Sequence, residues 1–259
     1  MERASAASGI PRAGSGHLAG PPRPEHFLLE LTKACNLRCV HCAVSSAGYV
    51  AESLPWAAFE RLLPTLRRLR PSVELSGHGE SLVYKRFFDA FVAVVEAGCP
   101  VTFITNATLL APELSERMLA YAGPRGWNHV TVSIDAAEPE LFERLRRGAR
   151  FETVVSNLEA LNETKRRLGL EHPVVGFNTV LMRDNLDQLS GIVALASRVG
   201  AASVTLVELL EYDHFSGHRL EELGVEVRRS LASARAEAKS RGVHLALVPG
   251  LKERLGETD

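Results

Sequence analysis

Short hydrophobic runs alternate with longer amphipathic segments along most of this chain. Six runs are rich in Val, Ile, Thr and Phe and almost continuously apolar, which is typical of strands buried on both faces of a parallel sheet. They cover residues 26–32, 72–77, 100–106, 129–135, 174–181 and 203–209. The intervening segments have the periodicity of amphipathic helices. The clearest of these span 54–69, 85–98, 151–169, 185–200 and 224–242.

This alternation predicts an α/β fold. Strand–helix units in series form right-handed crossovers, and their strands make a parallel sheet. A closed TIM barrel has eight such units, two more than the chain offers. The pattern therefore leaves two architectures, an open six-stranded partial barrel and a doubly wound sheet. A seventh apolar run at 244–248 adds an edge strand to either one.

Net charge and composition indicate which partners and which location to expect for this protein. The sequence has a net charge of −1, so we expect neither nucleic acid nor a membrane surface as a partner. Basic runs at 66–70 and 143–150 are interspersed with acids, and we interpret them as solvated helix faces. We find no apolar run of the roughly 18 to 20 residues that span a membrane. Residues 1–24, rich in Ala, Gly, Ser and Pro, predict a disordered leader.

Polar residues follow the predicted strands at their carboxyl ends, where the chemistry of parallel α/β folds gathers. The first strand runs into a cluster of cysteines, and the second runs into a glycine-rich turn. The residues at the ends of the other four strands are Asn106, Ser133, Asp135, Asn178 and Glu208. Because all six strand ends carry such residues, we predict a single polar mouth.

Three of the four cysteines form a C-x3-C-x2-C run, Cys35, Cys39 and Cys42. This clustering points to an intracellular metal site rather than a disulfide framework, so we expect a cytoplasmic protein. Soft thiolates suit zinc or iron–sulfur, but structural zinc needs four ligands, and we expect His41 to point away. We interpret the run as the ligands of a four-iron cluster, in which three cysteines leave one iron open to another ligand. We predict that Cys99, the fourth cysteine, is an inert residue of the core.

The stretch CNLRCVHC, with Thr32 and Asn36 around it, resembles the signature of the radical S-adenosylmethionine (radical SAM) superfamily. Further motifs follow in the family's order between residues 27 and 210. GHGE resembles the family's GGE motif, and TNATLL resembles its TNGTLL, with Ala107 in place of glycine. These and two later segments cover residues 77–80, 105–110, 132–136 and 177–185.

The resemblance implies an open partial (β/α)6 TIM-type barrel of parallel strands, over residues 25–222. Residues 223–259 then supply a C-terminal helix, the edge strand and a tail. It also implies a [4Fe-4S] cluster on the three cysteines, with the fourth iron open to S-adenosylmethionine (SAM). The implied contacts to SAM come from His41, Gly77, Gly79, Glu80, Asn106, Ser133, Asp135, Asn178 and Glu208. For the short polar residues, helix or loop capping is the alternative, and for His41 it is a solvent-facing position.

By the same resemblance, the activity is reductive cleavage of SAM to a 5′-deoxyadenosyl radical, which abstracts hydrogen from a substrate. An external reductant such as flavodoxin or ferredoxin supplies the electron. The cofactor carries the difficult chemistry, so no protein acid–base set is needed. The rival interpretation is a non-catalytic iron–sulfur electron carrier or a zinc-stabilised binding module.

The motifs do not name the substrate. We expect a peptide, a protein or a small molecule, and a reaction in peptide or protein modification or in natural-product or cofactor biosynthesis. Residues 207–220 resemble the peptide- and protein-modifying SPASM/twitch-type members. Those members carry further cysteines for auxiliary clusters, whereas here no cysteine follows Cys99. Either the enzyme consists of the barrel alone, or the chain stops before such an extension.

Overall fold

The computed structural model describes residues 23–210, 212, 214–216, 218, 220 and 224–255. Within these ranges seven strands form one sheet in the order β1-β3-β4-β5-β7-β8-β9, and every neighbouring pair is parallel. They are β1 (His26–Leu28), β3 (Ser72–Glu74), β4 (Val101–Thr105), β5 (Trp127–Ser133), β7 (Val174–Leu181), β8 (Ser203–Glu208) and β9 (His244–Leu247). The expected leader falls almost wholly outside the described residues.

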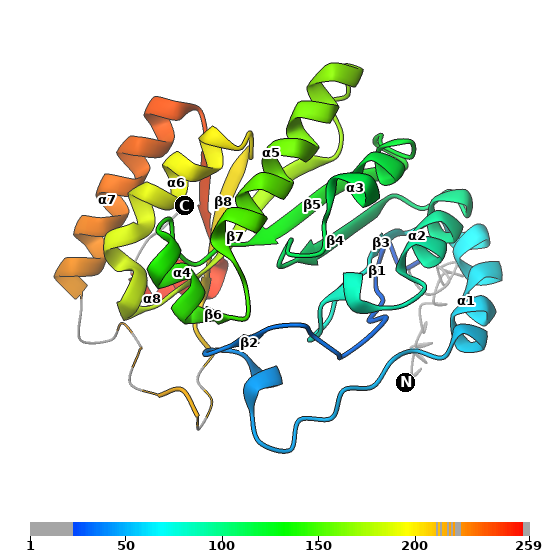
Figure 1. Cartoon of the computed structure of the whole chain (residues 1–259), viewed down its shortest axis with the longest axis horizontal. Helices are drawn as coiled ribbons and strands as arrows, with labels where there is room; N and C mark the ends of the chain where they lie inside the picture. The colour runs from blue at the N-terminus through cyan, green and yellow to red at the C-terminus, as the bar shows by residue number, and fades with distance from the viewer. Residues whose placement is uncertain are drawn as a thin grey trace, which may run out of the picture.

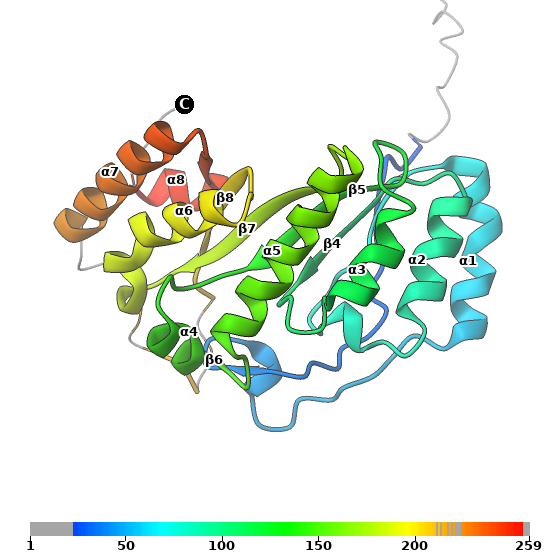
Figure 2. The same ribbon diagram turned by 45° about the horizontal axis from the view of Figure 1, so that its top comes forward.

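Helices connect the strands, and most of them cover one face of the sheet (Figures 1 and 2). The five predicted helices correspond to α1 (Trp56–Leu69), α2 (Phe87–Glu96), α5 (Phe151–Leu168), α6 (Leu189–Arg198) with the 3-10 turn η3 (Arg183–Gln188), and α7 (Gly224–Arg241). Three short helices were not predicted, α3 (Pro112–Leu119), α4 (Pro139–Leu145) and α8 (Pro249–Leu255). Each begins at a proline, a residue favoured at the first helical position. The 3-10 turns η1 (Ala43–Ser45) and η2 (Ser81–Val83) complete the helical elements.

The helix-covered face of the sheet carries the core. Alternate residues of β4, Val101 and Phe103, are buried there, and the ring of Phe103 stacks on that of Trp127 with 5.6 Å between centroids. Phe103 also meets the Phe87 ring of α2 edge-on at 5.4 Å. Cys99 is fully buried just before β4, which confirms the prediction of a core residue.

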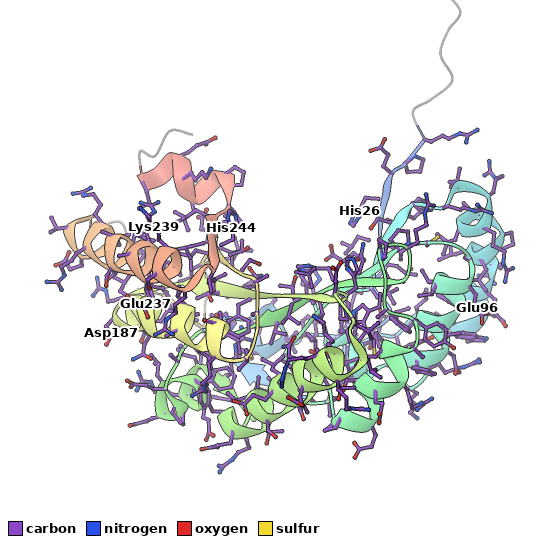
Figure 3. The ribbon with its side chains drawn as sticks, turned by 90° about the horizontal axis from the view of Figure 1, so that it is seen from above. His26, Glu96, Asp187, Glu237, Lys239 and His244 are labelled. Atoms are coloured by element: carbon purple, nitrogen blue, oxygen red, sulfur yellow. The ribbon has the colours of Figure 1, made fainter. Side chains whose placement is uncertain are left out.

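The other face of the sheet is concave and lined by half-buried side chains such as Thr102 and Thr131. Figure 3 shows the curved sheet from above, with His26 and His244 near its opposite edges. The described strands form an open partial barrel, as predicted, and β9 is the expected edge strand, parallel to β8. None of the helices in the described ranges has the length and hydrophobicity needed to cross a membrane.

A second, two-stranded sheet lies at the carboxyl end of the barrel strands (Figure 1). It pairs β2 (Arg38–Cys39) antiparallel with β6 (Arg146–Arg147), and the amide of Val40 donates to the carbonyl of Leu145 at 2.9 Å. The interpretation of 143–150 as a solvated helix face is therefore wrong, because α4 ends at Leu145 and Arg146 is buried. The other basic run matches the prediction, since Arg67 and Arg68 are exposed on α1.

Candidate functional site

The cysteine loop, residues 35–42, follows β1 and is fixed by its own backbone. The amide of Leu37 donates to the Cys35 sulfur at 3.4 Å, and the amide of Cys42 donates to the Cys39 carbonyl at 3.2 Å. The hydroxyl of Ser45 donates to the same carbonyl at 2.7 Å. All three cysteines are free thiols; Cys39 is buried, and Cys35 and Cys42 are partly exposed. The loop therefore presents three thiols from one short segment.

The thiols are close enough to influence one another's ionisation. Burial raises the pKa of Cys39 to about 11, and burial also raises the pKa of Cys35. The negative charge of Cys42 adds to both shifts, the cation of Arg146 lowers the pKa of Cys39, and the anion of Glu80 raises that of Cys35. A bound metal deprotonates its thiol ligands outright. Three thiols are the donor set for a cluster with one open iron, and these are the residues that would hold it.

No three His, Cys, Asp or Glu side chains within the described ranges stand close enough to hold a single metal ion. The sequence prediction was a cluster on Cys35, Cys39 and Cys42, with His41 turned away from it. That assignment of ligands stays a prediction.

The glycine turn, residues 77–80, docks against the chain that leads into the cysteine loop. A Cβ on Gly79 would overlap the carbonyl of Ala34, and one on Gly77 would overlap the side chain of Glu30. The amide of Glu80 donates to the Ala34 carbonyl at 2.8 Å. Glycine is required here because backbone passes against backbone. The sequence predicted that these two glycines contact SAM. In the structure both let the turn pack closely against the protein itself.

Glu80 is 3% exposed, and its carboxylate is occupied by protein donors. It accepts from the Thr105 hydroxyl at 2.7 Å, from the Asn106 amide at 2.7 Å and from the Leu82 amide at 3.2 Å. Burial raises the pKa of Glu80, and these hydrogen bonds oppose that shift. The carboxylate therefore ties the glycine turn to the end of β4.

Asn106 lies beside the first cysteine. Its side-chain amide donates to Asn36 Oδ1 at 3.0 Å and stands 4.0 Å from the Cys35 sulfur. Its carbonyl oxygen accepts from the amide of Thr108 at 3.0 Å. The next residue, Ala107, adopts a left-handed backbone with φ of 58°, where the resembling motif has glycine. Asn106 is thus positioned by its own turn and reaches the cysteine loop.

Asp135 is completely buried, in an ion pair with Arg146. Arg146 Nη2 stands 2.7 Å from Asp135 Oδ2, and the amide of Val180 donates to Oδ1 at 2.9 Å. His41 Nε2 is 3.3 Å from the same Oδ2, and only 8% of the His41 side chain is exposed. Burial lowers the pKa of His41 despite the nearby carboxylate. These three residues form a buried group, which we call the charge cluster, behind the cysteine loop.

Sequence reasoning missed Arg146. The residue lies in a basic run, and no feature of the run distinguishes the buried arginine from its exposed neighbours Arg144 and Arg147. The pairing of Arg146 with Cys39 does so, and that pairing links positions more than one hundred residues apart.

Ser133 and Asn178 are neighbours in register on β5 and β7, and Thr205 continues the row on β8. All three are half-buried on the concave face; Ser133 ends β5, whereas Asn178 and Thr205 lie within β7 and β8. Paired residues of adjacent strands point to the same face, so this row faces one space. Glu208 lies farther along β8, where a Cβ on Gly250 of α8 would come within 3.7 Å of its carboxylate.

Part of the segment after β8 packs onto the cysteine loop. His214 Nδ1 lies 3.2 Å from the Ser46 hydroxyl. The ring of Phe215 meets His41 edge-on with 6.4 Å between centroids, and it stacks on His218 at 3.9 Å. Phe215 is buried by these contacts. The described residues of this segment therefore shield the side of the loop that carries His41.

A family model described as the radical SAM superfamily matches residues 29–196. The mycofactocin maturase MftC of Mycolicibacterium smegmatis is 29% identical over 192 residues, which cover 74% of this chain and 46% of the relative. The AdoMet-dependent heme synthase of Methanosarcina barkeri is 30% identical over 183 residues, 70% of this chain and 49% of the relative. A GTP 3′,8-cyclase of Caulobacter vibrioides is 28% identical over 89% of this chain and 66% of its own length.

Solved structures share the fold. Streptococcus suis SuiB bound to S-adenosylmethionine superposes with a TM-score of 0.67 at 18% identity, over 87% of this chain and 50% of that one. The protein anSMEcpe with bound AdoMet gives 0.67 at 14% identity, over 90% and 67%. The chain spans about half the length of the first curated relatives that it matches. Because the family model covers well over half of its residues, the chain belongs to the radical SAM superfamily.

Proposed function

We propose that this chain is the core of an enzyme that binds a [4Fe-4S] cluster on Cys35, Cys39 and Cys42 and cleaves SAM reductively. The observation that carries the proposal is the docking of the three-thiol loop at the carboxyl end of the open barrel. There the glycine turn 77–80 docks against Ala34, just before the loop, and His41 of the loop stands 3.3 Å from Asp135, which follows β5. When bound, the cluster supplies the electron that cleaves SAM and so starts hydrogen abstraction from the substrate.

The protein's own residues hold and enclose this chemistry. In our proposal the side-chain amide of Asn106 stabilises the ligand sulfur of Cys35, while Ser133 and Asn178 offer hydrogen bonds to the bound SAM. Phe215 shields one side of the cysteine loop, and excluding water strengthens the electrostatic interactions inside such a site. Ser133 and Asn178 keep the SAM contacts that the sequence predicted, whereas Asn106, also predicted to contact SAM, is assigned here to a cysteine ligand.

Two further predicted SAM ligands, Glu80 and Asp135, also take a different role in this proposal. Glu80 and Asp135 are buried, and their carboxylates already accept from protein donors. We assign them to positioning the turns around the cluster. The backbone carbonyls of the turn 77–80 are the acceptors for the SAM ammonium in their place.

For the substrate, the proposal favours a peptide. MftC is a maturase, and SuiB has a crystal structure bound to precursor peptide SuiA. We place an extended peptide along the concave face, where half-buried side chains lie beside the polar row. The heme synthase and GTP cyclase matches make a small molecule the second candidate. An external one-electron donor such as flavodoxin or ferredoxin completes the partners.

Anaerobic reconstitution with iron and sulfide tests the proposal, followed by dithionite and SAM. We expect about four iron per chain, as the cluster formula requires, and formation of 5′-deoxyadenosine. Cys39→Ala should abolish both, whereas Cys99→Ala, the matched control from the core, should keep both. A colourless protein that binds zinc and forms no 5′-deoxyadenosine would establish the binding-module alternative. A cluster without SAM cleavage would establish the electron carrier.

A further inference from the structure

The β2–β6 pair has two faces of different character. Residues directly opposite each other in a strand pair share a face. Arg38 stands opposite Arg147, and both are exposed; Cys39 stands opposite Arg146, and both are buried. The side chain of Arg146 therefore lies on the same inward face as a predicted cluster ligand.

Arg146 is held there as a buried cation. It is 6% exposed, and its Nη2 contacts Asp135 Oδ2 at 2.7 Å. Its Nε is buried without a hydrogen-bond partner among the described residues. Desolvating an ion pair costs free energy that the attraction often fails to recover, so a buried pair is weak evidence for a purely stabilising role. The partly unsatisfied guanidinium points instead to a role in the site.

The cation is the charge that faces the cysteine loop through the strand pair, because Arg146 lies directly opposite Cys39, whereas Asp135 contacts the loop through His41. Asp135 moderates it and, together with the Val180 amide that binds its other oxygen, keeps the guanidinium in place.

We propose that Arg146 is a positioning residue whose fixed positive charge, oriented by Asp135, raises the reduction potential of the cluster bound by Cys39. The inference rests on the proposed function. One-electron reduction adds a negative charge to the cluster, and a nearby cation in a low-dielectric surrounding stabilises that charge. Net charge and local electrostatics are among the factors that set cluster potentials.

A mediated redox titration of the reconstituted full chain without SAM, followed by electron paramagnetic resonance, tests this role. Arg146→Gln removes the cation and should shift the midpoint potential to more negative values. Asp135→Asn removes the opposing anion and should shift it to more positive values. Arg146→Lys keeps the charge and should stay near the parent, and so should Arg147→Gln, the neighbouring exposed control.

The opposite signs separate electrostatics from structure, because mere loosening of the loop would move both neutral variants the same way. Shifts of equal sign, or unchanged potentials in both, would overturn the inference. If Arg146→Gln takes up no iron, Asp135→Asn decides: a positive shift supports the inference, and any other result overturns it. If the parent takes up no cluster at all, the proposed function itself fails, whereas a loaded, SAM-cleaving parent confines any failure to the role of Arg146.

Discussion

Two buried carboxylates flank the cysteine loop, and the protein satisfies them in different ways. Among the described residues, Glu80 accepts from uncharged donors, two backbone amides and a hydroxyl, and its charge acts on Cys35. Asp135 is paired with the cation of Arg146, and this pair acts on Cys39. One end of the loop therefore faces a carboxylate held by uncharged donors, and the other faces a buried ion pair.

The difference indicates separate tasks. Neutral hydrogen bonds fix the geometry of a turn at modest cost, whereas a buried charge pair adds a strong local field. Glu80 joins the turn after β3 to the end of β4, the next strand of the sheet along the chain. Asp135 joins β5 to a distant strand pair, so its loss should be felt across the fold.

The largest effect should follow removal of one member of the charge pair. Asp135→Ala leaves Arg146 buried without its partner, so we expect a loss of about 3–5 kcal/mol in the free energy of unfolding. Urea unfolding of the apo chain measures this. Asp89→Ala, which breaks an exposed pair with Arg86, is the control and should cost less than about 1 kcal/mol. Similar losses in the two variants would remove the distinction drawn for Asp135.

The second effect concerns pH. Burial raises the Cys39 pKa from 9.0 to about 11, so the folded chain keeps the thiol protonated while the unfolded chain ionises. This contribution to stability is complete below pH 9 and is lost as the pH rises to 11, at about 1.4 kcal/mol per pH unit. Under reducing conditions, Cys39→Ala should flatten the decline of apo stability between pH 9 and 11. Cys35→Ala should flatten it less, and the reverse order would contradict the assignment of the two ends.

Glu80→Gln should cost about 1–3 kcal/mol, because the new amide group turns an N–H toward a buried donor that loses its acceptor. Thermal unfolding of the apo chain measures the loss. Glu74→Gln is the matched control, since the Glu74 carboxylate is partly exposed and pairs with the ring of His26 at 3.6 Å. A neutral Glu80→Gln would mean that the three hydrogen bonds do not hold the turn.

The smallest effect should come from the turn that Glu80 binds. Ala107 has φ of 58°, a conformation that costs an alanine about 1–2 kcal/mol. Ala107→Gly relieves this strain but removes a buried methyl and adds freedom to the unfolded chain. We expect a net change within about 1 kcal/mol by urea unfolding. A loss above about 2 kcal/mol would show that packing of the methyl outweighs the backbone strain.

The nearly continuous apolar runs predicted a parallel α/β sheet, and the resemblance to the radical SAM signature selected the partial barrel. The loop was predicted because three thiols share one short segment. It could not predict what occupies the carboxylates of Glu80 and Asp135. Their partners come from other strand ends and from β6, whose pairing with Cys39 carries no periodic signal. The same pattern that marked both acids as ligand residues is produced by acids that bind the protein itself.

The most direct test of the central claim is Mössbauer spectroscopy of the chain reconstituted with iron-57, recorded with and without SAM. Three cysteine ligands on a four-iron cluster leave one iron for SAM. We predict that SAM changes the signal of about one iron in four and leaves the rest unchanged, and that Cys99→Ala behaves like the parent. A spectrum that does not respond to SAM, or a chain that retains no iron, would contradict the account.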